Sequence, residues 1–104
     1  MMGFMTTDHL VNITIELTGV AKDIAGKSDI QMSLSSQDTY HDVVESLATQ
    51  YPSLVNILIA PDKKNFLSSN LFIINDEMND PVFFMDQHPK DGDRLTLVSV
   101  MTGG

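Results

Sequence analysis

Two segments near the beginning of the chain alternate between apolar and polar residues. The apolar positions are Val11, Ile13, Ile15 and Leu17 in the first segment and Ile30, Met32 and Leu34 in the second. Because successive side chains of a strand point to opposite faces, this period predicts half-buried strands over residues 11–17 and 30–35. Their connection is about ten residues long and contains Gly19 and Gly26, so we expect a hairpin without a tight turn.

The period changes to that of a helix at Thr39. Apolar side chains then recur at the spacing of one helical face, at Tyr40, Val43, Val44, Leu47, Ala48 and Tyr51. This spacing predicts an amphipathic helix from Thr39 to Tyr51. Thr39 is placed to accept a hydrogen bond from the backbone N–H of Asp42, and Pro52 ends the helix because a residue before proline disfavours the helical region.

The pattern after this helix is less regular. Residues 54–60 are apolar but short, and they fit helical or 3₁₀ turns as well as a strand, with Pro61 as the end in each case. Residues 70–74 are rich in Phe and Ile and predict a strand. The polar cluster at 75–81 then predicts a reversal of the chain.

The last third of the chain predicts two more strands. Residues 82–84 are expected to form a short edge strand, followed by a loop in which Gly92 fits a turn of positive φ. Residues 95–101 are mostly apolar, with Leu or Val at 95, 97, 98 and 100, and we expect a strand with little solvent on either face.

This order of elements predicts an α+β fold in which one long helix packs on one face of a single mixed sheet. The first and last strands are the most apolar, so we expect them to be the central pair and to run parallel. The helix residues Val43, Val44 and Leu47 should then contact Ile13, Ile15, Leu95 and Leu97. We expect a domain over residues 10–101, a flexible N-terminal extension at 1–9 and a flexible tail at 102–104.

Length and charge exclude several classes of protein. A chain of 104 residues is expected to form one domain, and its 14 acidic against 6 basic residues argue against nucleic-acid binding. The chain has no cysteine, no apolar stretch long enough to span a membrane and no signal peptide at its beginning. We therefore expect a cytoplasmic protein with neither nucleic acid nor membrane as a partner.

Candidate catalytic residues are sparse. His9, His41 and His88 are far apart in the sequence, and none has a second ligand at a spacing typical of metal sites, so we predict no metal site. Gly-rich phosphate-binding loops and the serine nucleophile motif are both missing from the sequence. We expect a protein that is not an enzyme by itself.

The most informative feature is the end of the chain, where an apolar strand leads directly into Gly103 and Gly104. Two closing glycines occur by chance in about one sequence in two hundred at average glycine usage. A terminus without side chains can enter a narrow channel and present its carboxylate to another protein's active site. A tail without function is the alternative.

Residues 92–104, GDRLTLVSVMTGG, resemble the end of the ubiquitin-like sulfur-carrier family (MoaD/ThiS). The similarity is greatest to the small subunit of molybdopterin synthase and more distant to the thiamine sulfur carrier, and it extends in pattern over residues 11–104. Small archaeal modifier proteins share this fold. One difference is that the molybdopterin subunit commonly has Pro-Pro where this chain has Ser99 and Val100, which leaves the pathway open.

The resemblance implies a β-grasp domain whose Gly104 carboxylate is adenylated by an ATP-dependent enzyme related to ubiquitin-activating enzymes. Sulfur attack then gives a C-terminal thiocarboxylate, which a second partner uses, such as the large molybdopterin synthase subunit. The resemblance also implies that Val100, Met101, Thr102 and Gly103 contact the partner and that the chain binds no cofactor itself. Two alternatives stay open: a covalent modifier joined to lysines through Gly104, and a non-covalent β-grasp interaction domain.

Overall fold

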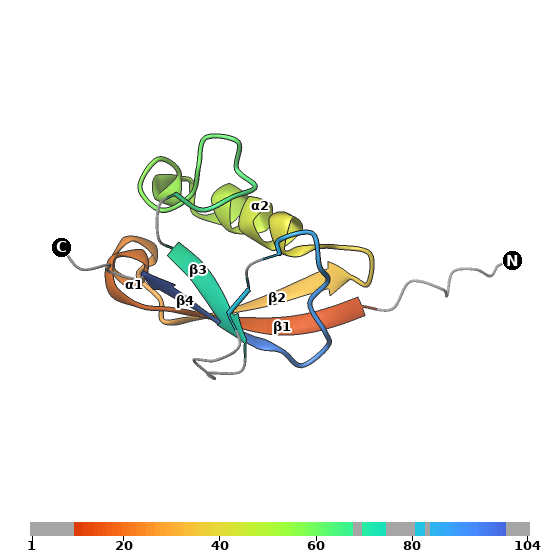
Figure 1. Ribbon diagram of the computed structural model, residues 1–104. Helices are drawn as coiled ribbons and strands as arrows, with labels where there is room; N and C mark the ends of the chain where they lie inside the picture. Colours follow the sequence, from red (N-terminus) through yellow and green to blue (C-terminus); the bar gives the residue numbers. More distant parts are fainter. Residues whose placement is uncertain (1–9, 68–69, 75–80, 83, 100–104) are drawn as a thin grey trace, which may run out of the picture.

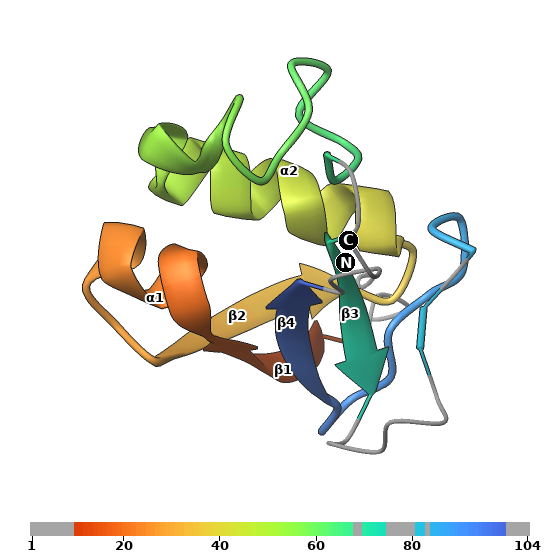
Figure 2. The same ribbon diagram turned by 60° about the vertical axis from the view of Figure 1, so that its left-hand side comes forward.

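The computed structural model describes residues 10–67, 70–74, 81, 82 and 84–99. Its elements are β1 (Leu10–Leu17), α1 (Gly19–Ala25), β2 (Asp29–Ser35), α2 (Tyr40–Gln50), the 3₁₀ helix η1 (Pro52–Leu54), β3 (Asn70–Ile74) and β4 (Arg94–Ser99). Helix α2 crosses one face of a four-stranded sheet, and α1 and η1 lie together at one end of it (Figures 1 and 2).

The sheet has the order β2-β1-β4-β3, so the first and last strands are its central pair. β1 runs parallel to β4 and antiparallel to β2, and β3 runs antiparallel to β4. The register aligns Ile15 with Leu95 and Leu17 with Leu97, which brings the apolar faces of the two central strands side by side. This is the expected β-grasp arrangement, and the predicted central parallel pair is confirmed.

Helix α2 covers the apolar face of the sheet and forms the core with it. Its buried residues are Tyr40, Val43, Val44, Leu47 and Ala48, in one cluster with Ile13, Ile15, Leu95 and Leu97 as expected. Thr39 caps the helix in a capping box in which the Asp42 carboxylate accepts the backbone N–H of Thr39 at 2.8 Å. Tyr51 follows the last helical turn, so the helix ends before Pro52 as predicted.

The sequence did not predict the helix in the connection between β1 and β2. Helix α1 has seven residues, which is too short for its few apolar positions to define a helical period. Packing stabilises it instead, because Ala21 is buried against the core. Gly26 ends the helix in the left-handed region at φ 73°, and its N–H donates to the carbonyl of Lys22 at 2.9 Å.

The expectation that the last strand is buried on both faces is wrong. In β4, Leu95 and Leu97 are buried, whereas Arg94, Thr96 and Val98 are partly exposed. The reason is that α2 covers only one face of the sheet. Strand β4 ends at Ser99, and the last two residues of the predicted strand, 100 and 101, lie outside the described residues.

The predicted edge strand over residues 82–84 differs from the structure. Residues 81 and 82 form a single bridge to β3, in which the N–H of Val82 donates to the carbonyl of Phe72 at 2.9 Å, and no strand is assigned to the described residues of 82–84. The segment after α2 begins as the 3₁₀ helix η1 and continues in turns, in agreement with one of the open alternatives. Gly92 adopts the predicted positive φ, at 88°.

Candidate functional site at the end of β4

The candidate site begins where β4 ends, because the predicted reactive terminus follows that strand. β4 pairs with a neighbour on each side, and its last residue, Ser99, is opposite Asn70 of β3. The hydroxyl of Ser99 donates to the side-chain oxygen of Asn70, and the hydroxyl of Thr18 donates to the carbonyl of Leu97 at 2.8 Å. The end of β4 is therefore held on both sides, by β3 and by the residue that precedes α1.

All of the site residues predicted from the sequence follow this point directly. Val100, Met101, Thr102, Gly103 and Gly104 lie outside the described residues, so their roles stay predictions. Five residues of extended chain span at most about 17 Å. The carboxylate of Gly104 can therefore be presented no farther than about that distance from Ser99.

The open face of the sheet, which α2 does not cover, changes from polar to apolar across the strands. On the β1 and β2 side, Arg94 of β4 forms ion pairs with Glu16 at 3.1 Å and Asp29 at 2.9 Å. The hydrogen bond with Glu16 is the main cause that raises the pKa of Arg94 above its ordinary value. On the β3 side, Leu71 and Val98 are paired and half-buried, so the apolar part of this face adjoins the end of β4.

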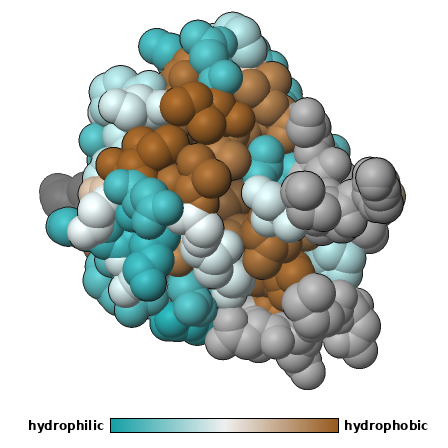
Figure 3. Space-filling view, turned by 90° about the vertical axis from the view of Figure 1, so that its left-hand side faces the viewer, coloured by the Kyte–Doolittle hydropathy of each residue, from teal (hydrophilic) through white to brown (hydrophobic). Residues whose placement is uncertain are grey.

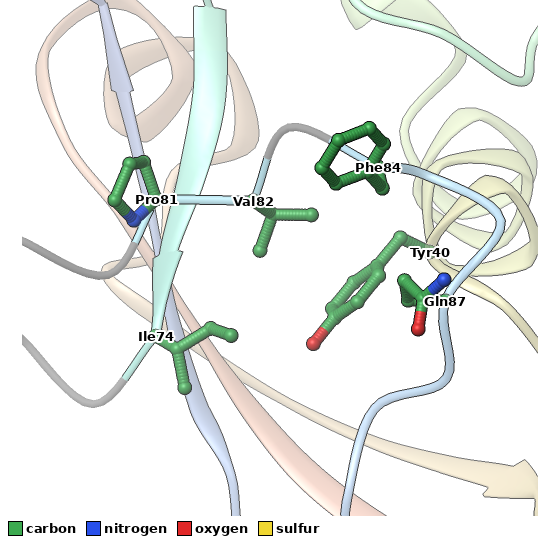
Figure 4. Close-up of a pocket in the computed structure, with 6 residues that line it drawn as sticks. All are labelled: Tyr40, Ile74, Pro81, Val82, Phe84 and Gln87. Atoms are coloured by element: carbon green, nitrogen blue, oxygen red, sulfur yellow. The ribbon is translucent and has the colours of Figure 1, made fainter.

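A shallow hollow of about 140 Å³ lies beside Tyr40, the first residue of α2. It is lined by Tyr40, Ile74, Pro81, Val82, Phe84 and Gln87, and Figure 4 shows the Tyr40 ring entering it across from Ile74. Its lining is apolar apart from Tyr40 and Gln87. The hollow is lined by Ile74, which is opposite Leu95 near the start of β4, so it does not adjoin Ser99 at the end of that strand (Figure 1).

The described histidines have structural partners. The ring Nδ1 of His41 is 2.8 Å from the carbonyl of Lys64, and that of His88 is 3.0 Å from the carbonyl of Asp38. Since a carbonyl only accepts hydrogen bonds, each Nδ1 carries the proton. Among the described residues, no three potential metal ligands come together, and His9 lies outside that part of the chain.

The loop that His41 contacts contains Asp62, a carboxylic acid whose pKa is lowered. The Asp62 carboxylate accepts the backbone N–H of Lys64 at 2.8 Å and the side-chain amide of Asn65 at 2.9 Å. These bonds favour the charged form and lower the pKa of Asp62 below its ordinary value of 3.8, with the Lys64 bond as the main cause. Asp62 is exposed and stabilises a turn, so it belongs to the fold rather than to a reactive site.

The family model of the ThiS family matches residues 15–104, which is most of the chain and includes both terminal glycines. The chain belongs to the ThiS family. Members of this family are small ubiquitin-like carriers or modifiers, generally non-catalytic, that work with adenylating enzymes and acceptor proteins. The predicted membership of the ubiquitin-like sulfur carriers is thereby confirmed.

Solved structures with the same fold come from this group of proteins. Small archaeal modifier protein 1 from Haloferax volcanii has a TM-score of 0.72 at 18% identity, over 89% of this chain and 99% of its own. A putative molybdopterin converting factor subunit 1 from Pyrococcus furiosus has a TM-score of 0.68 at 14% identity, over 88% and 99%. Urm1 from Trypanosoma brucei has a TM-score of 0.63 at 22% identity, over 96% and 100%.

No sequence among the curated proteins matches this ThiS-family chain. At these identities the solved structures show the shared β-grasp fold.

In the part of the chain that the structure describes, no helix is both long and apolar enough to cross a membrane.

Proposed function

We propose that this ThiS-family protein is a sulfur carrier whose reactive group is the carboxylate of Gly104. The observation that carries the proposal is the family match, which extends through Gly103 and Gly104 to the end of the chain. The fold supports it, because β4 is a central strand held at Ser99 and gives the terminal residues a fixed starting point. Val100 to Gly103 would then bind the partner in extended form.

The chemistry requires activation because a carboxylate is a poor electrophile. The Gly104 carboxylate attacks the α-phosphate of ATP bound by the partner, which releases pyrophosphate and leaves an acyl-adenylate. Hydrosulfide attacks the acyl carbon next, AMP leaves, and the terminus becomes a thiocarboxylate without a change in oxidation state. The chain itself binds no cofactor in this scheme, and the reaction takes place in the cytoplasm.

Molybdopterin synthesis is the pathway that we propose, with the large molybdopterin synthase subunit as sulfur acceptor. The structural similarity to the putative molybdopterin converting factor subunit from Pyrococcus furiosus supports this choice. The alternative function is a covalent modifier, in which a lysine amine displaces AMP and forms an isopeptide bond. The similarity to small archaeal modifier protein 1 favours this alternative.

A direct test is to mix the purified chain with the ubiquitin-activating-type enzyme of its source cell, ATP and inorganic sulfide. We expect pyrophosphate release that depends on the chain, followed by a thiocarboxylate on Gly104 seen by intact mass. Adenylation with transfer only to lysines would assign the modifier function instead. No pyrophosphate release would contradict both functions.

A further inference from the structure

The sheet has two edge strands, β2 and β3, and the structure covers them differently. At β3, Val82 donates its backbone N–H to the carbonyl of Phe72 at 2.9 Å, so residues 81 and 82 occupy part of that edge. Among the described residues, no strand or bridge pairs with the outer side of β2, which is seven residues long. An edge without a neighbour presents unpaired N–H and C=O groups. The outer side of β2 is therefore where the sheet can accept a further strand.

The pairing of β2 with β1 determines which of its backbone groups face outward. The N–H of Leu17 donates to the carbonyl of Ser28 at 2.7 Å, and the antiparallel register continues from this pair along both strands. Hydrogen-bonded pairs alternate with non-bonded pairs in an antiparallel ladder. The apolar residues of β2 therefore direct their N–H and C=O groups to β1, and the polar residues Gln31 and Ser33 direct theirs outward.

A turn closes the outer side of β2 at the end of the strand. The Asp38 carboxylate accepts the N–H of Ser35 at 2.9 Å, and the N–H of Asp38 donates to the carbonyl of Ser35 at 3.0 Å. Both outward groups of Ser35 are thus used within the chain. The free stretch is the outer side of residues 29–33, which we name the β2 edge.

The β2 edge lacks the features that usually keep an edge strand from pairing. Natural edge strands are blunted by Lys or Pro residues, by bulges or by a covering loop. Strand β2 contains neither Lys nor Pro, and its register with β1 continues without a bulge. Its exposed side chains are polar, unlike the hydrophobic ones that gather at the end of the domain with α1 (Figure 3). The β2 edge therefore offers backbone hydrogen bonds rather than an apolar contact.

Charge indicates which kind of strand fits the β2 edge. Asp29 and Asp38 lie at its two ends, and the chain has a net charge of −8. Arg94 pairs with both Asp29 and Glu16, so this cluster keeps a negative charge. Antiparallel pairing of two copies about the middle of β2 would place Asp29 of one copy beside Asp38 of the other, and opposed like charges destabilise a sheet. An extended segment with Lys or Arg side chains complements the edge instead.

We propose that the β2 edge binds an extended basic segment of another protein, which adds a fifth strand to the sheet. Main-chain hydrogen bonds to Gln31 and Ser33 give the affinity, and Lys or Arg side chains near Asp29 and Asp38 give the selectivity. The added strand lies three strand spacings, about 14 Å, from β4, because β2 and β1 lie between them. The segment can therefore bind whether or not the terminus at Gly104 is engaged, and the inference does not depend on the reaction proposed there.

The test measures amide hydrogen exchange of the full chain by NMR, with a synthetic peptide of alternating lysine and valine as the probe. In the free chain, the N–H groups of Gln31 and Ser33 should exchange faster than those of Ile30 and Met32, which bond to β1. At about ten times its Kd, the peptide should slow exchange at Gln31 and Ser33 about tenfold. The control peptide, with glutamate in place of lysine, should bind about tenfold more weakly.

A backbone substitution tests whether main-chain bonds hold the peptide. Ser33→Pro removes one outward N–H and leaves the bonds to β1 in place, and Ser33→Ala is the matched control because it keeps that N–H. We expect Ser33→Pro to weaken peptide binding about tenfold and Ser33→Ala to bind like the parent chain. Where thermal unfolding of Ser33→Pro is altered, the parent chain is measured with a lysine peptide that is N-methylated on the side facing β2, which should not slow exchange.

Each contrary outcome overturns a stated part of the inference. Exchange at Gln31 and Ser33 that the lysine peptide does not slow overturns the binding site. Equal binding of the glutamate peptide overturns the basic partner, and undiminished binding of the N-methylated peptide overturns strand addition. A dimer in sedimentation, with Gln31 and Ser33 already protected in the free chain, assigns the β2 edge to a second copy and also overturns the inference.

Discussion

Deletion of Gly104 is expected to abolish adenylation of the chain by its activating enzyme and to leave its thermal unfolding unchanged. The enzyme must bring the terminal carboxylate in line with the α-phosphate of ATP, and an extended chain advances about 3.3 Å per residue. A chain that ends at Gly103 therefore holds its carboxylate out of reach. Stability should not change, because the core consists of residues from 11 to 97.

Two further variants define what the terminus requires. One residue appended to Gly104 should also abolish adenylation, because it displaces the carboxylate in the opposite direction. Gly103→Val should fail because a β-branched side chain adds bulk and restricts the backbone. Adenylation of the Gly104 deletion at the parent rate would contradict the carrier and modifier functions together and leave the non-covalent interaction domain as the remaining account.

Leu47→Ala is expected to lower the free energy of unfolding by about 2–5 kcal/mol. Leu47 is fully buried in the middle of α2, in the cluster formed with β1 and β4. Truncation removes apolar side-chain volume from this cluster and leaves a cavity that a packed core closes only in part. For a domain of this size, each kcal/mol corresponds to about 4–8 °C in Tm.

Denaturant unfolding of Leu47→Ala measures this loss, with Leu10→Ala as the control. Leu10 is 68% exposed, so its truncation should change the free energy of unfolding by less than about 0.5 kcal/mol. An equally small change in Leu47→Ala would contradict the packing of α2 on the sheet.

Most of the β-grasp core was predictable because its elements have clear periods. The alternation over 11–17 defines the apolar face of β1, and the helical spacing after Thr39 defines the face of α2 that packs on it. Two apolar surfaces of this kind exclude water by packing on each other, which is why the helix lies across the sheet. The central parallel pairing of β1 and β4 was predicted correctly because these two strands are the most apolar ones.

The parts that sequence reasoning missed depend on tertiary contacts. Helix α1 has no clear period, and it forms because Ala21 packs on the core and Gly26 ends the helix. The predicted last strand is mostly apolar, but the open face of β4 carries Arg94, Thr96 and Val98 and is covered only in part, so these residues are partly exposed. The predicted edge strand is reduced to a bridge between Pro81 and Ile73, which depends on how this segment packs beside β3.

The candidate site was predictable in one respect and not in another. The proposed reactive group is the carboxylate of Gly104, so Gly103 and Gly104 could be proposed directly from the sequence. The contacts that hold the end of β4 could not, because the Thr18 bond to Leu97 and the Ser99 bond to Asn70 join residues that are far apart in the sequence.

The most direct test of the central claim is the intact mass of the protein purified from its source cell while the sulfur pathway is active. A sulfur carrier predicts a fraction of the full chain that is heavier by the difference between one sulfur and one oxygen atom, with the change located on Gly104 by fragmentation. The Gly104 deletion, expressed in the same cell, should lack this species. A mass spectrum with the plain carboxylate alone, or with lysine conjugates and no thiocarboxylate, would contradict the sulfur-carrier account.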